Sequence, residues 1–172
     1  MFVIATSDFG TRLSTLATPR MLIGVISDTH GQIRDSALRA LQGVELILHA
    51  GDVGRRTVLD ALRAVAPVHA VYGNVDARDG ALLDRFGTEL AGQRIHMSHG
   101  HELGSPTPEA LVARYDADIV IYGHTHRPLV RELRGTLVLN PGAAGPARFD
   151  LKPSLALLTL PDRLVQIITL EP

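Results

Sequence analysis

Side chains that bind metals recur in this sequence where runs of apolar residues end. The run at 21–27 leads into SDTHG, the run at 44–50 ends in HAGD, the run at 68–73 leads into GNVD, and two later runs end in SHGH and GHTH. The residues at these ends are Asp28, His30, Asp52, Asn74, Asp76, His99, His101, His124 and His126. Ordinary turn chemistry explains any one of these motifs. Their repetition at five run ends, each beside a glycine, indicates one shared site.

Oxygen and nitrogen ligands without sulfur are suited to Mn, Fe, Zn, Ni or Co. The chain has no cysteine, so thiolate sites and cysteine nucleophiles are excluded. The carboxylate, amide and imidazole groups are too many for one tetrahedral ion, and they fit two ions about 3.5–4 Å apart that share a carboxylate. Asp52 is the natural bridge, because it follows a glycine at the end of a central strand. Water between two such ions would have its pKa lowered from ~15.7 towards ~7, which indicates a hydrolase.

The elements that must position these groups follow from the hydrophobic periodicity. Strands at 21–27, 44–50 and 68–73 alternate with helices at 34–43 and 55–66. This βαβαβ run predicts parallel strands whose carboxyl ends share one crevice. The remaining predicted elements are a hairpin of 88–92 and 94–99, a helix at 108–117, a strand at 118–123, and strands at 128–133, 136–140, 154–160 and 164–170. Their closely spaced turns indicate an antiparallel section, and two packed sheets with helices outside would accommodate both halves.

Length and charge restrict the classes of function. A chain of 172 residues is expected to form one domain. Its 17 basic and 18 acidic residues give no electrostatic reason to expect a nucleic-acid or membrane partner. No apolar run approaches the ~20 residues of a membrane helix, so we expect a soluble, cytoplasmic protein.

Residues 1–20 are expected to be an N-terminal extension outside the core fold, with the domain at 21–172. The apolar stretch FVIA is short and no charged leader precedes it, which makes a poor secretory signal. The extension represents either an upstream start codon or an ordered arm that packs on a neighbour.

The motifs DTHG, GDVG, GNVD, HGH and GHTH, in this order, resemble those of the calcineurin-like metallophosphoesterases. More narrowly, residues 21–170 resemble the small single-domain phosphodiesterases related to the retromer scaffold subunit. The resemblance implies an α/β fold, a four-layer sandwich of two mixed sheets flanked by helices. It implies two divalent transition-metal ions, with Mn favoured and Fe, Zn, Ni or Co as alternatives. One ion would be held by Asp28, His30, Asp52 and His126, and the other by Asp52, Asn74, His99 and His124.

Within this resemblance we expect His124 and His126 to point to the same side of an extended segment, each towards a different ion, because strand side chains repeat with period two. Gly123 would permit the turn that brings them there. His49 is expected to lie in a strand beneath the site, and His69 and His96 to be structural or exposed.

One position departs from the family pattern. Many relatives have His after the Gly-Asn pair, where this chain has Val75. Loss of a general acid commonly lowers the rate 10²–10⁴-fold, so we expect a preference for diesters with good leaving groups. His101 and Asp76 are candidate substitutes, although either would equally orient a ligand. Arg148 in the loop LNPGAAGPAR is a candidate anion contact, with Asn74 as a second substrate contact.

The function expected from these observations is hydrolysis of a small or nucleotide-like phosphodiester by attack of a metal-bridging hydroxide. Two alternatives stay open. One is a non-catalytic scaffold that uses the same fold to bind proteins, and the other is a protein phosphatase or nuclease. Relatives are often dimers or tetramers, so a homo-oligomer is a further open question.

Overall fold

The computed structural model describes residues 19–78, 80–147 and 150–171. Arg148 and all but the last two residues of the predicted extension lie outside the described residues. In chain order the elements are β1 (Met21–Ile26), α1 (Asp35–Ala40), β2 (Leu46–His49), α2 (Arg56–Arg63), β3 (Val68–Ala70), β4 (Arg85–Leu90), β5 (Gln93–Ser98), η1 (His101–Leu103), α3 (Pro108–Arg114), β6 (Ile119–Ile121), β7 (Leu129–Leu133), β8 (Thr136–Asn140), β9 (Ser154–Leu160) and β10 (Leu164–Thr169).

The first sheet has the strand order β10-β9-β1-β2-β3. β1 pairs in parallel with β2, and β2 with β3, which confirms the predicted βαβαβ run. β9 adds to the other side of β1 in the antiparallel direction and pairs with β10. All four residues of β2 are buried, as its apolar run Leu46–Leu48 predicts for an inner strand covered on both faces. The carboxyl ends of β1, β2 and β3 therefore meet at one edge of the sheet.

The second sheet has the order β4-β5-β6-β8-β7, and it differs from the prediction for this half of the chain. The β4–β5 and β7–β8 hairpins are antiparallel as expected, but β6 lies between β5 and β8 and is parallel to both. Parallel neighbours need a crossover connection, and α3 supplies it between β5 and β6. β9 and β10 also leave this half and complete the first sheet, so each sheet is mixed.

The β4–β5 hairpin turns at Ala91–Gly92, the last two residues of the predicted strand 88–92. Both residues have positive φ, 48° and 74°, which a two-residue type I′ turn requires. Arg134–Gly135 makes the same turn between β7 and β8, with φ of 53° and 82°. Glycine in the second position of each turn is the sequence signal that sets the register of both hairpins.

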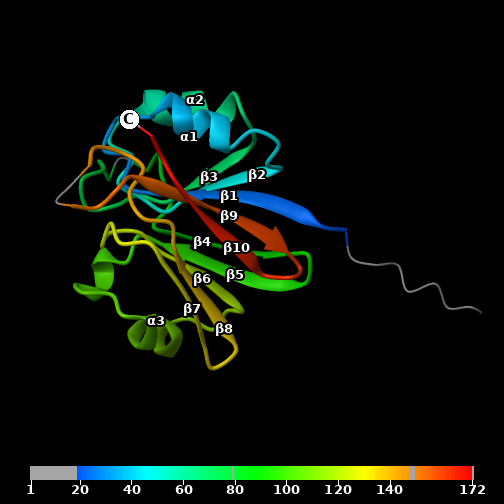
Figure 1. Ribbon diagram of the computed structural model, residues 1–172. Helices are drawn as coiled ribbons and strands as arrows, with labels where there is room; N and C mark the ends of the chain where they lie inside the picture. Colours follow the sequence, from blue (N-terminus) through cyan, green and yellow to red (C-terminus); the bar gives the residue numbers. More distant parts are fainter. Residues whose placement is uncertain (1–18, 79, 148–149, 172) are drawn as a thin grey trace, which may run out of the picture.

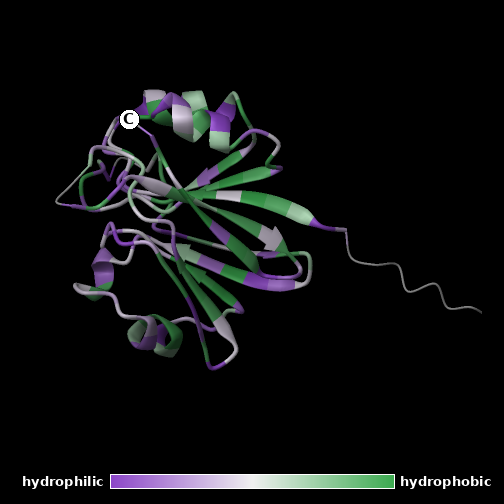
Figure 2. Cartoon of the chain, in the orientation of Figure 1, coloured by the Kyte–Doolittle hydropathy of each residue, from purple (hydrophilic) through white to green (hydrophobic). Residues whose placement is uncertain are grey.

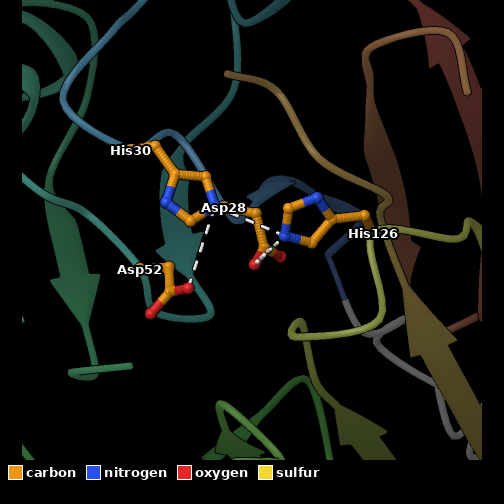
Figure 3. A group of neighbouring side chains, drawn as sticks. All are labelled: Asp28, His30, Asp52 and His126. Atoms are coloured by element: carbon orange, nitrogen blue, oxygen red, sulfur yellow. Dashed lines mark hydrogen bonds and ion pairs between the residues drawn. The ribbon is translucent and has the colours of Figure 1, made fainter. Parts of the chain in front are cut away.

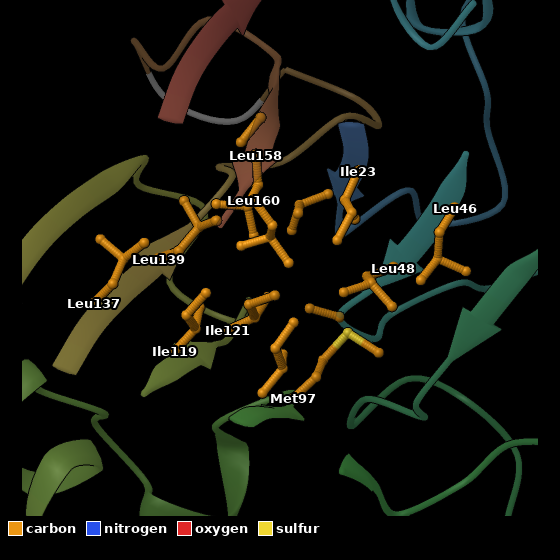
Figure 4. Packing of buried hydrophobic residues seen from close by; sticks show 14 of the residues in the cluster. Ile23, Leu46, Leu48, Met97, Ile119, Ile121, Leu137, Leu139, Leu158 and Leu160 are labelled. Carbon is orange, nitrogen blue, oxygen red and sulfur yellow. The ribbon is translucent and has the colours of Figure 1, made fainter. Parts of the chain in front are cut away.

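The two sheets pack face to face with helices outside, which confirms the four-layer α/β sandwich (Figure 1). α1 and α2 cover the outer face of the first sheet, and α3 covers the outer face of the second (Figure 1). Between the sheets, Ile23 and Leu48 of the first meet Met97, Ile121 and other apolar residues of the second (Figure 4). Figure 2 shows the hydrophobic residues concentrated in the strands between the helical layers. Each such side chain contributes about 1.5–3 kcal/mol when fully buried.

The helices are short and amphipathic. α2 buries Val58, Leu59 and Leu62 on its sheet-facing side. In α3 the Thr107 hydroxyl accepts the Ala110 N–H at 3.2 Å, and the helix ends at Arg114, three residues earlier than predicted. Among the described residues, no helix is both long enough and apolar enough to cross a bilayer.

Candidate metal centre

Four of the predicted ligands converge from three loops (Figure 3). Asp28 and His30 follow β1, Asp52 follows β2, and His126 follows β6. One ligand atom from each residue lies within 4.8 Å of the other three. His126 Nε2 lies 3.1 Å from Asp28 Oδ1 and 3.3 Å from His30 Nε2. Two carboxylates and two imidazoles at this separation form a donor set suited to one divalent transition-metal ion.

The two carboxylate oxygens of Asp28 have different surroundings, although the residue is fully buried. Oδ2 accepts the His124 backbone N–H at 3.1 Å and lies 2.7 Å from the Ser27 hydroxyl. Oδ1 lies 3.1 Å from His126 Nε2 but accepts no hydrogen bond from any described residue. A buried polar atom without a hydrogen bond is destabilising by about 1–3 kcal/mol. A cation beside Oδ1 would remove that penalty.

Asp52 lies between this cluster and a second one. Its Oδ2 is 3.8 Å from His30 Nε2, while its Oδ1 is 3.4 Å from His99 Nε2 and accepts the Val75 N–H at 3.1 Å. Burial has the largest effect on the pKa of Asp52 and raises it. The hydrogen bond and charge of His99, the Val75 N–H and the charge of His30 outweigh burial, and they lower the pKa from 3.8 to about 2. Asp52 is therefore ionised at neutral pH, with one oxygen directed to each cluster.

In the second cluster, two imidazoles direct nitrogen atoms at one amide oxygen. His99 Nδ1 lies 2.8 Å from the Ala50 carbonyl oxygen, and His124 Nε2 lies 3.2 Å from the Gly104 carbonyl oxygen. A carbonyl only accepts, so these two nitrogens carry hydrogen. The opposite nitrogens, His99 Nε2 and His124 Nδ1, lie 3.2 and 3.1 Å from Asn74 Oδ1. Acceptor atoms in this arrangement repel one another unless a positive charge lies among them.

The pKa of His99 reports the same preference for positive charge. Burial is its largest influence and lowers it, but the hydrogen bond to Asp52 and the charges of Asp28 and Asp52 raise the pKa above 6.5. A metal ion at this cluster would therefore compete with protons.

Five of the eight described non-glycine residues with positive φ are predicted ligands. They are Asp28 (53°), His30 (47°), Asp52 (54°), His124 (65°) and His126 (59°). Asp and His tolerate this region better than most residues, but each such residue still carries strain of order 1–3 kcal/mol. Strain gathered in the residues of one crevice supports a functional role for that crevice.

His124 and His126 do not lie on an extended segment, so the prediction from strand periodicity was wrong. β6 ends at Ile121, and both histidines have left-handed backbone. Two left-handed residues separated by one position turn the chain enough to send His124 towards Asn74 and His126 towards Asp28. The two rings do face different clusters, but backbone conformation is the cause.

Gly123 has a different role from the predicted one. A Cβ at this position would lie 2.8 Å from both the Ala50 carbonyl oxygen and Asp28 Oδ2. Glycine is therefore required for close packing of three loops. Gly73 acts similarly, because a Cβ there would lie 2.1 Å from Asp52 Oδ1.

Asp76 and His101, the two candidate proton donors, have contrasting surroundings. The carboxylate of Asp76 accepts backbone N–H groups from Gly54 at 2.7 Å, Gly73 at 2.8 Å and Val53 at 3.0 Å. The His101 ring lies beside His99, with 5.4 Å between ring centroids, and its buried Nδ1 has no hydrogen-bond partner among the described residues. Burial is the main cause that lowers the pKa of His101, helped by the charge of His99.

Two supporting residues were not predicted. The Asn140 amide donates to the Gly123 carbonyl at 2.7 Å and to the Thr125 hydroxyl at 3.1 Å, and thereby holds the turn that carries His124 and His126. The Ser27 hydroxyl lies within hydrogen-bond distance of Asp28 Oδ2 and of the Gly142 carbonyl. Only the position of Ser27 directly before Asp28 hinted at its role.

The other histidines lie where they were expected. His49 ends β2, is fully buried, and its Nε2 lies 3.0 Å from the Thr29 hydroxyl. His69 is exposed and stacks on Phe86, and His96 is half-buried and stacks on Tyr115.

Comparison with known proteins identifies the family. The family model of the calcineurin-like phosphoesterase superfamily domain matches residues 21–163. The chain belongs to this superfamily. As a calcineurin-like phosphoesterase it is a metal-dependent hydrolase of phosphate esters, a class that uses divalent metals.

Relatives of this phosphoesterase carry names that agree. It is 40% identical over 134 residues to a probable metallophosphoesterase of Methanothermobacter thermautotrophicus, covering 72% of this chain and 77% of that one. It is 35% identical over 143 residues to the phosphodiesterase YfcE of Escherichia coli, covering 68% and 76%. Among solved structures, wild-type Vps29 of Entamoeba histolytica complexed with Zn²⁺ is similar, with a TM-score of 0.72, 30% identity, and coverage of 86% of this chain and 97% of that one.

Proposed function

We propose that this phosphoesterase is a dinuclear phosphodiesterase that hydrolyses a small or nucleotide-like phosphodiester. Asp28, His30, Asp52 and His126 would hold one ion, and Asp52, Asn74, His99 and His124 the other. The observation that carries this proposal is the position of Asp52, whose Oδ2 faces His30 and whose Oδ1 faces His99. A carboxylate that offers one oxygen to each cluster is the bridge that a two-ion site needs.

The donor set of oxygen and nitrogen atoms is suited to Mn, Fe, Zn, Ni and Co. Manganese is the proposed metal among these because the family resemblance favours it. The zinc complex of the similar Vps29 supports metal binding by this fold. When bound, two such ions supply Lewis-acid activation of water and of the phosphoryl group.

The side chains of this chain would orient and complete the reaction. Ser27 and the His124 N–H fix one oxygen of Asp28, and the Ala50 and Gly104 carbonyls fix the tautomers of His99 and His124. Asn74 would contact the substrate as well as an ion.

We assign the proton donor to His101. Its ring adjoins the rings of His99 and His124, and its Nδ1 lies 3.7 Å from Glu102 Oε2 and has no hydrogen bond to a described residue. Asp76, whose oxygens already accept three N–H groups, is assigned a positioning role instead.

Hydrolysis after metal reconstitution tests the proposal. Wild type and the Asp52→Asn and His124→Ala variants would be assayed with bis(p-nitrophenyl) phosphate and p-nitrophenyl phosphate in Mn²⁺, Zn²⁺, Ni²⁺ or Co²⁺. The diester should be preferred, and both variants should lose at least about a hundredfold in kcat/KM. His69→Ala is the matched control, because His69 is exposed and its ring stacks on Phe86, which is not a candidate ligand. Full activity in Asp52→Asn and His124→Ala would overturn the two-ion mechanism.

If the protein is a non-catalytic scaffold, the wild type should hydrolyse neither ester, because a scaffold needs no intact set of metal ligands. Among the described residues, the large hydrophobic side chains exposed outside the candidate metal centre are Leu83, Val130 and Leu164. Val130 lies on β7 of the second sheet and Leu164 on β10 of the first, so these side chains do not favour one continuous apolar docking surface.

A further inference from the structure

A cavity adjoins the candidate metal centre. Its volume is about 190 Å³, and it lies between α2 and the loop that follows β3. The lining residues that bear on its chemistry are Arg55, Arg56, Arg63, Asp76, Leu59 and Leu82. A pocket for a drug-sized ligand is typically about 300–1,000 Å³. This cavity is therefore sized for one small group of a larger ligand.

The charges around the cavity favour an anion. Among the described residues that line it, three are arginines and one is an aspartate. Arg63 pairs with Asp60 at 3.2 Å, whereas Arg55 and Arg56 form no ion pair within the part of the chain that the structure describes. Asp76, the carboxylate among the described lining residues, accepts three backbone N–H groups, which offsets its repulsion of an anion. Guanidinium groups bind phosphate oxygens in bidentate geometry.

The cavity is joined to the metal centre through the chain itself. Gly54 lines the cavity and is two residues beyond Asp52, which is at most about 7 Å of extended chain. The backbone of Gly54 packs on His30, since a Cβ on Gly54 would lie 2.7 Å from the His30 carbonyl carbon. The side chain of Arg55 packs over Gly31, the residue after His30. A substrate held at the metal centre thus lies within reach of the arginines.

We propose that this arginine-lined cavity binds a second phosphate group of the substrate, separate from the diester that is cleaved. This inference rests on the proposed function. The favoured substrate class is then a nucleotide diester that also carries a terminal phosphate. Binding energy from this remote group is made equally before and during the reaction, so it lowers KM more than it raises kcat.

A matched pair of esters tests this. Thymidine 5′-(p-nitrophenyl phosphate) and the same ester with a 3′-phosphate differ only in the second phosphate. The phosphorylated ester should show a KM about tenfold lower or more. Arg55→Gln combined with Arg56→Gln should abolish the difference. Arg39→Gln, which removes an exposed arginine from neighbouring α1, should preserve it.

A binding measurement makes the test independent of turnover. Thymidine 3′,5′-bisphosphate would be titrated calorimetrically into wild type, the double variant and Arg39→Gln, all in EDTA. The Kd should rise about tenfold or more in the double variant alone.

The outcomes separate the two claims. Equal kinetics for both esters in wild type, or a preference that survives in the double variant, would overturn the cavity assignment and leave the phosphodiesterase intact. Failure to hydrolyse either ester with any of the metals would overturn the proposed function, and an unchanged Kd in the double variant would overturn the binding site itself.

Discussion

Replacing Asp76 by alanine distinguishes a positioning residue from a proton donor. The carboxylate of Asp76 joins three backbone segments, because it accepts the N–H groups of Val53, Gly54 and Gly73. Val53 and Gly73 are buried, whereas Gly54 is exposed and its N–H is able to bond to water after the substitution. Two buried donors without acceptors are destabilising by about 1–3 kcal/mol each.

The expected loss in the free energy of unfolding is therefore about 4 kcal/mol. For a chain of this size, 1 kcal/mol shifts Tm by roughly 2–4 °C, so Asp76→Ala should lower Tm by about 8–16 °C. Differential scanning calorimetry of the metal-free protein measures this directly. Asp116→Ala is the matched control, since Asp116 is 91% exposed and its ion pair with Arg94 is worth at most about 1 kcal/mol.

The pH dependence of kcat supplies the second measurement. A positioning role predicts that the surviving activity of Asp76→Ala keeps the shape of the wild-type pH profile. If Tm were unchanged while kcat fell and one limb of the profile disappeared, Asp76 would be the proton donor and the reasoning from its hydrogen bonds would be refuted.

Three further predictions follow from single contacts. Asn140→Ala should weaken Mn²⁺ affinity by about 10–100-fold in calorimetry, because the turn that carries His124 and His126 loses its support; unchanged affinity would contradict this. Burial is the main cause that lowers the pKa of His49 from 6.5 to about 4, so the stability it contributes is complete above pH 6.5 and is lost as pH falls towards 4. Between pH 7 and pH 5 the free energy of unfolding should fall by about 2 kcal/mol because of His49, as measured by urea unfolding. A His49→Gln variant whose free energy of unfolding changes with pH as steeply as in the wild type would disprove this assignment. Val75→His should raise kcat for esters with poor leaving groups, by up to about a hundredfold, because residue 75 is half exposed beside Asp52; identical kinetics across leaving groups would count against it.

Most of the fold was predictable from the sequence, and the structure places Asp28, His30, Asp52 and His126 close together, as the positions of their motifs after the strands suggested. Polar residues directly after β1 and β2 had to share an edge, because parallel neighbours end on the same side of a sheet. The second sheet was less predictable. The sequence of the short strand β6 does not indicate which strands it pairs with, so its parallel pairing with both β5 and β8 was not predicted.

The parts of the candidate site that escaped prediction depend on backbone atoms. The Ala50 and Gly104 carbonyls set the tautomers of His99 and His124. Every residue has a backbone carbonyl, so the sequence does not show which carbonyls contact a histidine. The left-handed conformations of His124 and His126 were also not predicted, because histidine adopts positive φ more often than most residues but far less regularly than glycine. Asp76 was predicted to be a candidate catalytic residue because, like the candidate ligands, it follows the end of a strand. Its hydrogen bonds to Val53, Gly54 and Gly73 are visible only in the structure.

The pairing of β1 with β2 does not stop where the strands end. The N–H groups of Asp28, His30 and Gly31 bond to the carbonyls of Gly51, Asp52 and Val53 at 2.9, 2.9 and 2.7 Å. These three hydrogen bonds join the two loops, so the loop after β1 moves away from the loop after β2 only when the bonds break. Hydrogen exchange at these three amides should report a single opening event, and escape of bound ions should be an all-or-none process governed by that opening.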